Sequence, residues 1–95
     1  MPRHADYIAA YDVTENKERE RVAKVLEGFG FRVQRSVFEL RLTRRQQEEL
    51  LAKLLELNLK SGFISLYRWD STAKRYDVGP VPERPHDESL HAYVL

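Results

Sequence analysis

Residues 6–13 read Asp-Tyr-Ile-Ala-Ala-Tyr-Asp-Val, and the architecture follows from this stretch. Six of its eight residues are apolar or aromatic, without helical spacing and without a strand breaker. A strand that is apolar on both faces is typical of the centre of a sheet. Tyr7 and Tyr11 alternate with Ile8 and Ala10, so both faces of the predicted sheet carry apolar groups.

A first amphipathic helix is predicted after this strand. We place its start at residues 14–16, where a Thr or Asn side chain can cap an exposed N–H group. Its apolar residues then recur with helical spacing, at Val22, Val25, Leu26 and Phe29. We expect Gly28 and Gly30 to end the helix, because glycine readily adopts the left-handed cap conformation.

The second half of the chain repeats this alternation of strand and helix. Residues 31–42 are β-like, but they are long for one strand, so a break is expected near residues 34–36. Thr43 and Gln46 match a capping box that starts a second helix. Strands are predicted over residues 63–69 and 76–78. The apolar residues expected to line the second helix are Leu50, Leu51, Leu54, Leu55 and Leu57.

The order of elements predicts an α+β, ferredoxin-like β-α-β-β-α-β sandwich with an additional C-terminal strand. Two helices would cover one face of a four-stranded antiparallel sheet. We assign residues 1–79 to this domain and residues 80–95 to a proline-rich spacer followed by a strand over residues 90–95. Because the second sheet face is also apolar, we expect a homodimer, with the C-terminal strand pairing at the dimer interface.

Composition excludes several kinds of site. The chain has 95 residues and no cysteine, which rules out disulfides, thiolate nucleophiles, zinc ribbons and iron–sulfur clusters. No apolar run approaches the roughly 20 residues that cross a bilayer, and the first residues lack the apolar region of a signal peptide. We therefore expect a cytoplasmic protein that does not bind membranes.

The formal net charge of +1 is unevenly distributed. Between Lys17 and Arg45, nine basic residues stand against four acidic ones, a net charge of +5, and the remainder of the chain carries −4. Basic segments suit polyanions such as nucleic acids. This segment is therefore the candidate surface for a nucleic-acid partner.

Asp12 is the candidate metal ligand. It closes an otherwise apolar strand just before a loop into a helix, where a carboxylate can either coordinate a hard divalent cation or accept a loop N–H. One carboxylate does not hold Mg²⁺ tightly, but a symmetric dimer would supply a second Asp12 across its axis. The sequence contains no glycine-rich phosphate loop and no recognised serine nucleophile motif.

Three motifs, taken in order, resemble a known family. Tyr11-Asp12-Val13 closes the first strand and is followed by a charged helix. The block Arg32-Val33-Gln34-Arg35-Ser36-Val37-Phe38-Glu39 precedes a leucine-rich helix and the strand Ile64-Ser65-Leu66-Tyr67. Over about residues 6–69 the chain is similar to the small CRISPR-associated adaptation subunit. This subunit is the second of the two universal CRISPR-associated proteins, and its family is that of the CRISPR-associated endoribonucleases.

This resemblance implies a ferredoxin-like homodimer that acts in spacer acquisition. The dimer would bridge two dimers of the companion CRISPR integrase and hold duplex DNA. The resemblance also implies a metal-dependent endonuclease activity on duplex DNA or on RNA, including single-stranded RNA. Asp12 matches the family's metal and catalytic aspartate, with Mg²⁺ shared across the dimer.

Further residues take roles from the same resemblance. Those expected to bind nucleic acid are Arg19, Arg21, Arg32 and Arg35, and those expected to support the site are Ser36 and Phe38. The chain departs from the family at residues 14–16, where an acidic pair is often found. Structural roles stay open for several of these residues: Phe38 in the core, Ser36 on backbone groups, and Arg19 and Arg21 on a solvated helix face.

Two other functions stay open beside the adaptation subunit. One is a toxin-type ribonuclease, because ferredoxin-like dimers also occur among such proteins. The other is a purely structural nucleic-acid-binding dimer without catalysis. Whether the chain is an enzyme therefore stays open.

Overall fold

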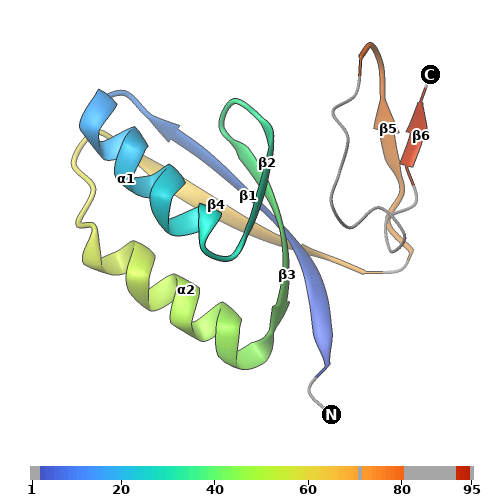
Figure 1. The fold of residues 1–95 in the computed structure, drawn as a ribbon, viewed down its shortest axis with the longest axis horizontal. Coiled ribbons are helices and arrows are strands. Elements are labelled where there is room, and N and C mark those ends of the chain that lie inside the picture. The colour runs from blue at the N-terminus through green and yellow to red at the C-terminus, as the bar shows by residue number, and fades with distance from the viewer. Residues whose placement is uncertain (1–2, 71, 81–91, 95) are drawn as a thin grey trace.

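A four-stranded antiparallel sheet with two helices on one face forms the body of the computed structural model, which describes residues 3–70, 72–80 and 92–94 (Figure 1). The strand order is β2-β3-β1-β4, so the first strand is central, as predicted. These elements make the expected ferredoxin-like sandwich, and their bounds are β1 His4–Val13, α1 Asn16–Glu27, β2 Gly30–Gln34, β3 Val37–Thr43, α2 Arg44–Glu56 and β4 Gly62–Trp69.

The core lies between the sheet and the two helices. Successive side chains of a strand point to opposite faces, and the odd-numbered residues of β1 from Tyr7 to Val13 are the buried ones. Alternate residues of β3 join them, together with a stripe from each helix. The largest fully buried side chains are Phe38, Leu26, Leu42, Leu50 and Val22.

Both ends of α1 differ from the expected caps. Glu15 is the N-cap residue, and its carboxylate accepts a hydrogen bond from the backbone N–H of Glu18 at 2.7 Å. Gly28 follows the last turn with a right-handed backbone, at φ −73°, and Gly30 does not have a positive φ either. The prediction of a left-handed glycine was wrong because the Gly28 N–H bonds back to Val25 and Leu26 without leaving the right-handed region.

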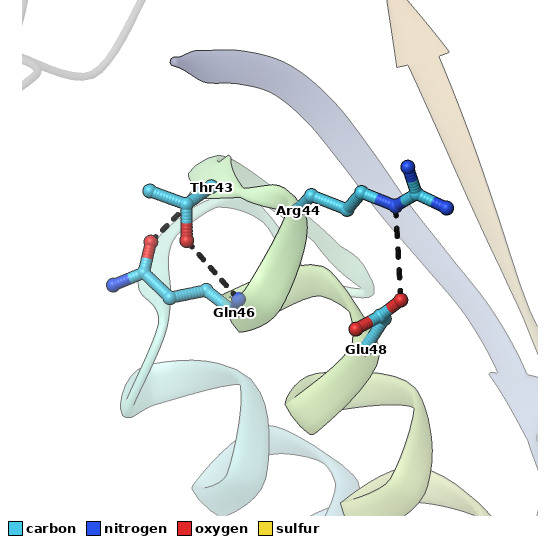
Figure 2. A network of polar contacts seen from close by, with 4 residues as sticks. All are labelled: Thr43, Arg44, Gln46 and Glu48. Atoms are coloured by element: carbon cyan, nitrogen blue, oxygen red, sulfur yellow. Dashed lines mark hydrogen bonds and ion pairs between the residues drawn. The ribbon is translucent and has the colours of Figure 1, made fainter. Parts of the chain in front are cut away.

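The predicted capping box starts α2 (Figure 2). The Thr43 hydroxyl accepts from the Gln46 N–H at 3.1 Å, and the Gln46 amide oxygen accepts from the Thr43 N–H at 2.9 Å. The expected core stripe is narrower than predicted: Leu50 and Leu54 are buried, but Leu51 is 38% exposed and Leu55 is 80% exposed. At about 100° per residue, these two leucines turn away from the sheet.

The break expected near residues 34–36 is confirmed as the turn between β2 and β3. Arg35 and Ser36 form the turn, and the pairing register shifts between Arg32 and Gln34, which marks a bulge. The Tyr11 N–H donates to the Ser36 carbonyl at 3.0 Å. The turn is thereby attached to the end of the central strand.

The C-terminal part forms a separate two-stranded sheet beyond the end of β4 (Figure 1). β5 (Arg75–Asp77) pairs in parallel with β6 (Ala92–Val94). Residues 81–91 and 95 lie outside the described residues, so the spacer and the ends of the strand predicted over residues 90–95 lie outside them too. Among the residues that the structure describes, no helix is long and apolar enough to cross a membrane.

The difference between the two faces of α2 predicts unequal effects of one substitution. Leu50→Ala should lower the free energy of unfolding by about 2–5 kcal/mol, because it opens a cavity in the core. Leu55→Ala should change it by less than about 0.5 kcal/mol, because this side chain is exposed. Urea unfolding of both variants measures the two effects, and equal losses would contradict the assignment of faces.

Candidate functional site

Asp12 lies near the end of β1 on the sheet face that the helices leave uncovered. Its neighbours Tyr11 and Val13 point into the core, so the alternation of the strand sends Asp12 the other way. Its side chain is exposed, and its pairing partner across the ladder is Phe63 of β4. Among the described residues, no hydrogen bond or ion pair engages the Asp12 carboxylate.

The uncovered sheet face, here called the open face, is strongly apolar. Directly paired residues of neighbouring strands share a face, which places Asp12 beside Phe63 and Ile8 beside Tyr67. Phe63 and Tyr67 are 63% and 59% exposed. The partly buried residues of the open face include Ile8, Ala10, Val37 and Ser65.

The connection from β1 to α1 is fastened by Arg19. One terminal nitrogen of its guanidinium, Nη1, donates to the carbonyl oxygens of Val13 at 3.1 Å and Thr14 at 2.7 Å. The other, Nη2, donates to the side-chain oxygen of Asn16. Three N–H groups of Arg19 thus hold the loop that follows Asp12. This contact gives Arg19 a role inside the protein in addition to the predicted role at nucleic acid.

The connection from α2 to β4 is fastened by Glu18, the residue that precedes Arg19 on α1. The Glu18 carboxylate accepts from the backbone N–H of Lys60 at 2.8 Å and of Ser61 at 2.9 Å, and from the Ser61 hydroxyl at 2.5 Å. These bonds, that from the Ser61 hydroxyl first, hold the pKa of the Glu18 carboxyl below its usual range, and the charge of Arg21 acts in the same direction.

Ser61 joins the two connections directly. Its carbonyl oxygen accepts from the Thr14 N–H and from the Thr14 hydroxyl, both at 3.1 Å. Its hydroxyl oxygen accepts from the Glu15 N–H at 3.0 Å. The next residue, Gly62, packs so closely on β1 that a Cβ atom there would overlap the Asp12 carbonyl and lie 2.7 Å from the Val13 Cα. Only glycine fits this contact.

Basic side chains gather in a hollow of about 410 Å³ between α1 and the β2–β3 turn. Three of the four arginines predicted to bind nucleic acid line it, namely Arg19, Arg32 and Arg35. Ser36 and Lys24 line it as well, together with the acidic Glu20 and Glu27. We call this region the basic hollow. The fourth arginine, Arg21, is exposed on α1 outside this lining.

The basic hollow and Asp12 lie on opposite faces of the sheet, although both are near the same end. Tyr11, which lines the hollow, and Asp12 are neighbours in a strand and therefore point to opposite sides. Phe38 is fully buried on the helix side, with the Arg32 guanidinium 5.3 Å from its ring centre. Phe38 therefore belongs to the core, and its ring forms a cation–π contact with the Arg32 guanidinium.

Within the described part of one chain, few side chains near Asp12 could bind a metal ion. No group of three or more His, Asp or Glu side chains suitable for a metal comes together within residues 3–70, 72–80 and 92–94. The exposed Asp12 carboxylate has the oxygen chemistry that Mg²⁺ prefers, and such sites use one or two carboxylates completed by water and substrate phosphates. The Asp12 carboxylate fits the chemistry of one such ligand.

The sequence did not lead us to expect three residues of this region, namely Glu18, Ser61 and Gly62. The spacing of Glu15 and Glu18 is that of a helix start, so a local role for Glu18 was accessible from the sequence. Its partners are 42 and 43 residues further along the chain. Nothing local signals a contact at that separation.

The lowered pKa of Glu18 predicts a pH dependence of stability. A carboxyl group whose folded pKa lies below its ordinary value of 4.5 stabilises the fold above about pH 4.5, and this contribution is lost as the pH falls toward the folded pKa. The difference in unfolding free energy between wild type and Glu18→Gln should therefore shrink from pH 7 to pH 3. For Leu50→Ala, which removes no ionisable group, the difference should stay constant. A constant difference for Glu18→Gln as well would contradict the assignment.

Comparisons of the sequence with protein-family models and with known proteins point to the same family. The family model for CRISPR associated protein Cas2 matches residues 6–77. A protein of Rhodospirillum rubrum named CRISPR-associated endoribonuclease Cas2 4 is 38% identical over 85 residues, which cover 86% of this chain and 68% of that protein. One of Thermus thermophilus named CRISPR-associated endoribonuclease Cas2 is 46% identical over 61 residues, or 63% of this chain and 65% of that protein.

The fold agrees with these matches. A solved structure described as the crystal structure of cas2 superposes with a TM-score of 0.67 at 27% identity, covering 87% of this chain and 92% of that one. The matched segment includes Asp12, the basic hollow and both fastened connections. By its sequence and its fold, the chain belongs to the CRISPR associated protein Cas2 family.

Proposed function

We propose that this chain is the adaptation subunit of a CRISPR system, a homodimer that holds duplex DNA between two dimers of the companion integrase. We further propose that the Asp12 carboxylates of the two copies together bind one shared Mg²⁺ ion for phosphodiester cleavage. The observation that carries the proposal is the position of Asp12, exposed at the end of an uncovered apolar sheet face.

The open face supports the homodimer. Exposed aromatic rings at Phe63 and Tyr67 on a sheet face that no helix covers favour burial against a second surface. Burying apolar area stabilises association by about 25 cal/mol per Å². A two-fold axis through this face would make it self-complementary, since the same patch then serves both copies. Such an arrangement also brings a second Asp12 to the same face.

The residues of the chain define what each would do at the metal. Asp12 would supply a carboxylate oxygen from each copy, and phosphate oxygens of the nucleic acid would complete the site. When bound, Mg²⁺ polarises the phosphodiester and orients the attacking water. Phe63, beside Asp12, would limit water around the carboxylates once it is covered.

The basic hollow supports the nucleic-acid role. Arg32 and Arg35 project from β2 and its turn toward α1, and guanidinium groups pair with phosphate oxygens in a bidentate way. Such contacts follow the backbone without selecting a sequence, which suits a protein that holds DNA of any sequence. Arg21, on the exposed side of α1, extends the basic surface.

A structural nucleic-acid-binding dimer without catalysis is the second candidate. It is favoured by the separation of the basic hollow from Asp12 across the thickness of the sheet. Within one copy, a nucleic-acid backbone held in the hollow does not pass the Asp12 carboxylate. Binding and cleavage would then be separate properties, and the first does not need the second.

A subunit-mixing experiment tests the shared metal site. Asp12→Asn should lower Mg²⁺-dependent cleavage at least about a hundredfold, since the metal contributes several kcal/mol. If each site needs both carboxylates, an equal mixture of wild type and variant after subunit exchange should keep about one quarter of the activity, because only that fraction of dimers is fully wild type. Asp6→Asn on the same strand is the control. About three quarters of the activity would show that one Asp12 suffices at the shared site, and about half that each copy acts with its own Asp12 alone. Unchanged cleavage by pure Asp12→Asn would eliminate its catalytic role.

A second experiment tests the role in adaptation. Replacement of both Arg32 and Arg35 by Gln should weaken duplex binding and reduce the slope of log affinity against log salt by about 0.9 for each phosphate that is no longer neutralised. The same variant should pull down less of the companion integrase in the presence of a duplex with splayed ends. The matched control is Arg44→Gln with Arg45→Gln, two exposed cations at the start of α2. An unchanged salt slope would exclude the basic hollow as the phosphate-binding surface.

A further inference from the structure

The position of Asp12 depends on the backbone around it, because its carboxylate has no partner of its own among the described residues. A side chain without hydrogen bonds is located by the segment that carries it, and metal ligands require support from a surrounding shell. The segment at issue is the end of β1 and the loop that follows. What fixes these residues therefore fixes the carboxylate.

One turn of α1 holds both chain segments that meet at this point. Arg19 holds the β1 side, through the carbonyls of Val13 and Thr14. Glu18 holds the β4 side, through the N–H groups of Lys60 and Ser61 and the Ser61 hydroxyl. The two residues are adjacent and carry opposite charges, so one accepts from donors and the other donates to acceptors. Together they fasten the two connections to one rigid element.

The contact between the two segments is tight enough to transmit displacement. The Ser61 carbonyl and hydroxyl oxygens accept hydrogen bonds from Thr14 and Glu15. Gly62 lies against the Asp12 backbone with no space for a side-chain carbon. A shift of residues 60–62 therefore moves the backbone of Asp12, because packed groups do not compress.

We propose that Glu18 is a positioning residue for Asp12, acting through Ser61 and Gly62. Its buried carboxylate replaces the water that would otherwise solvate the N–H groups of Lys60 and Ser61, and so keeps the start of β4 pressed on the end of β1. The inference rests on the proposed metal site, since it assigns Glu18 the task of placing the carboxylate for that site.

The test separates positioning from general stabilisation. Glu18→Ala removes the acceptor for three hydrogen bonds, Glu18→Gln keeps one carbonyl acceptor, and Glu56→Ala, at an exposed position on α2, is the control. Leu50→Ala opens a cavity in the core without removing any of these hydrogen bonds and serves as the control for reduced stability. Amide hydrogen exchange at residues 12–15 and the affinity for Mn²⁺ are measured under conditions in which every variant is folded.

We expect Glu18→Ala to speed exchange at residues 12–15 and to weaken Mn²⁺ binding by about tenfold or more, the range found when residues behind metal ligands are replaced. Glu18→Gln should fall between wild type and Glu18→Ala. Leu50→Ala and Glu56→Ala should leave both quantities at the wild-type value. Equal exchange at residues 12–15 in Glu18→Ala and Leu50→Ala would overturn the proposal.

A comparison of Mn²⁺ binding by wild type and Asp12→Asn distinguishes failure of the proposed metal site from failure of the proposed positioning role. If wild type and Asp12→Asn bind Mn²⁺ equally, Asp12 is not a metal ligand and the proposed catalytic function fails. The exchange rates still decide the positioning role in that case. Faster exchange confined to residues 12–15 in Glu18→Ala supports it, and wild-type exchange there eliminates it.

Discussion

The double pairing of β1 is the constraint on which the remainder of the structure depends. β3 pairs with its first seven residues and β4 with its last eight, so both edges of the strand are occupied over residues 6–10 and its side chains point to the two faces. One face packs on the helices through Tyr7 and Tyr11. Asp12 must then lie on the other face, because a slip by one residue would exchange every side chain between the two. The location of the candidate metal ligand thus follows from how the core is built.

The first turn of α1 connects this packing to function. Glu18 and Arg19 direct their charges to backbone groups at the end of the sheet. Hydrogen bonds to charged groups are about twice as strong as those between neutral groups, which suits a place where two connections meet without a core of their own. The exposed end of the sheet is thereby kept in one conformation. A carboxylate with no partner among the described residues can then stay accessible and still be well placed.

The separation of the basic hollow from Asp12 bears on how a member of the Cas2 family could combine two roles. The hollow lies on the helix side and the acidic group on the open face, so the two surfaces point in opposite directions. A dimer formed through the open face would leave the basic hollows on its outside. The proposed DNA scaffold and the proposed nuclease site would then use separate surfaces of the same small domain.

The sequence by itself determined the order of elements, the central position of residues 6–13, the turn near residues 34–36, the capping box at Thr43 and the identity of Asp12 as the candidate ligand. Apart from Asp12, whose metal role came from the family resemblance, these features are local, since each depends on alternation, helical spacing or turn chemistry within about ten residues. The tertiary structure alone decided that Leu51 and Leu55 face solvent, that Glu15 caps α1, that Arg19 bonds to the loop, and that Glu18 reaches Ser61. Which side of a helix meets the sheet, and which distant loop meets its first turn, depend on how the elements pack, and a periodic pattern does not contain that information.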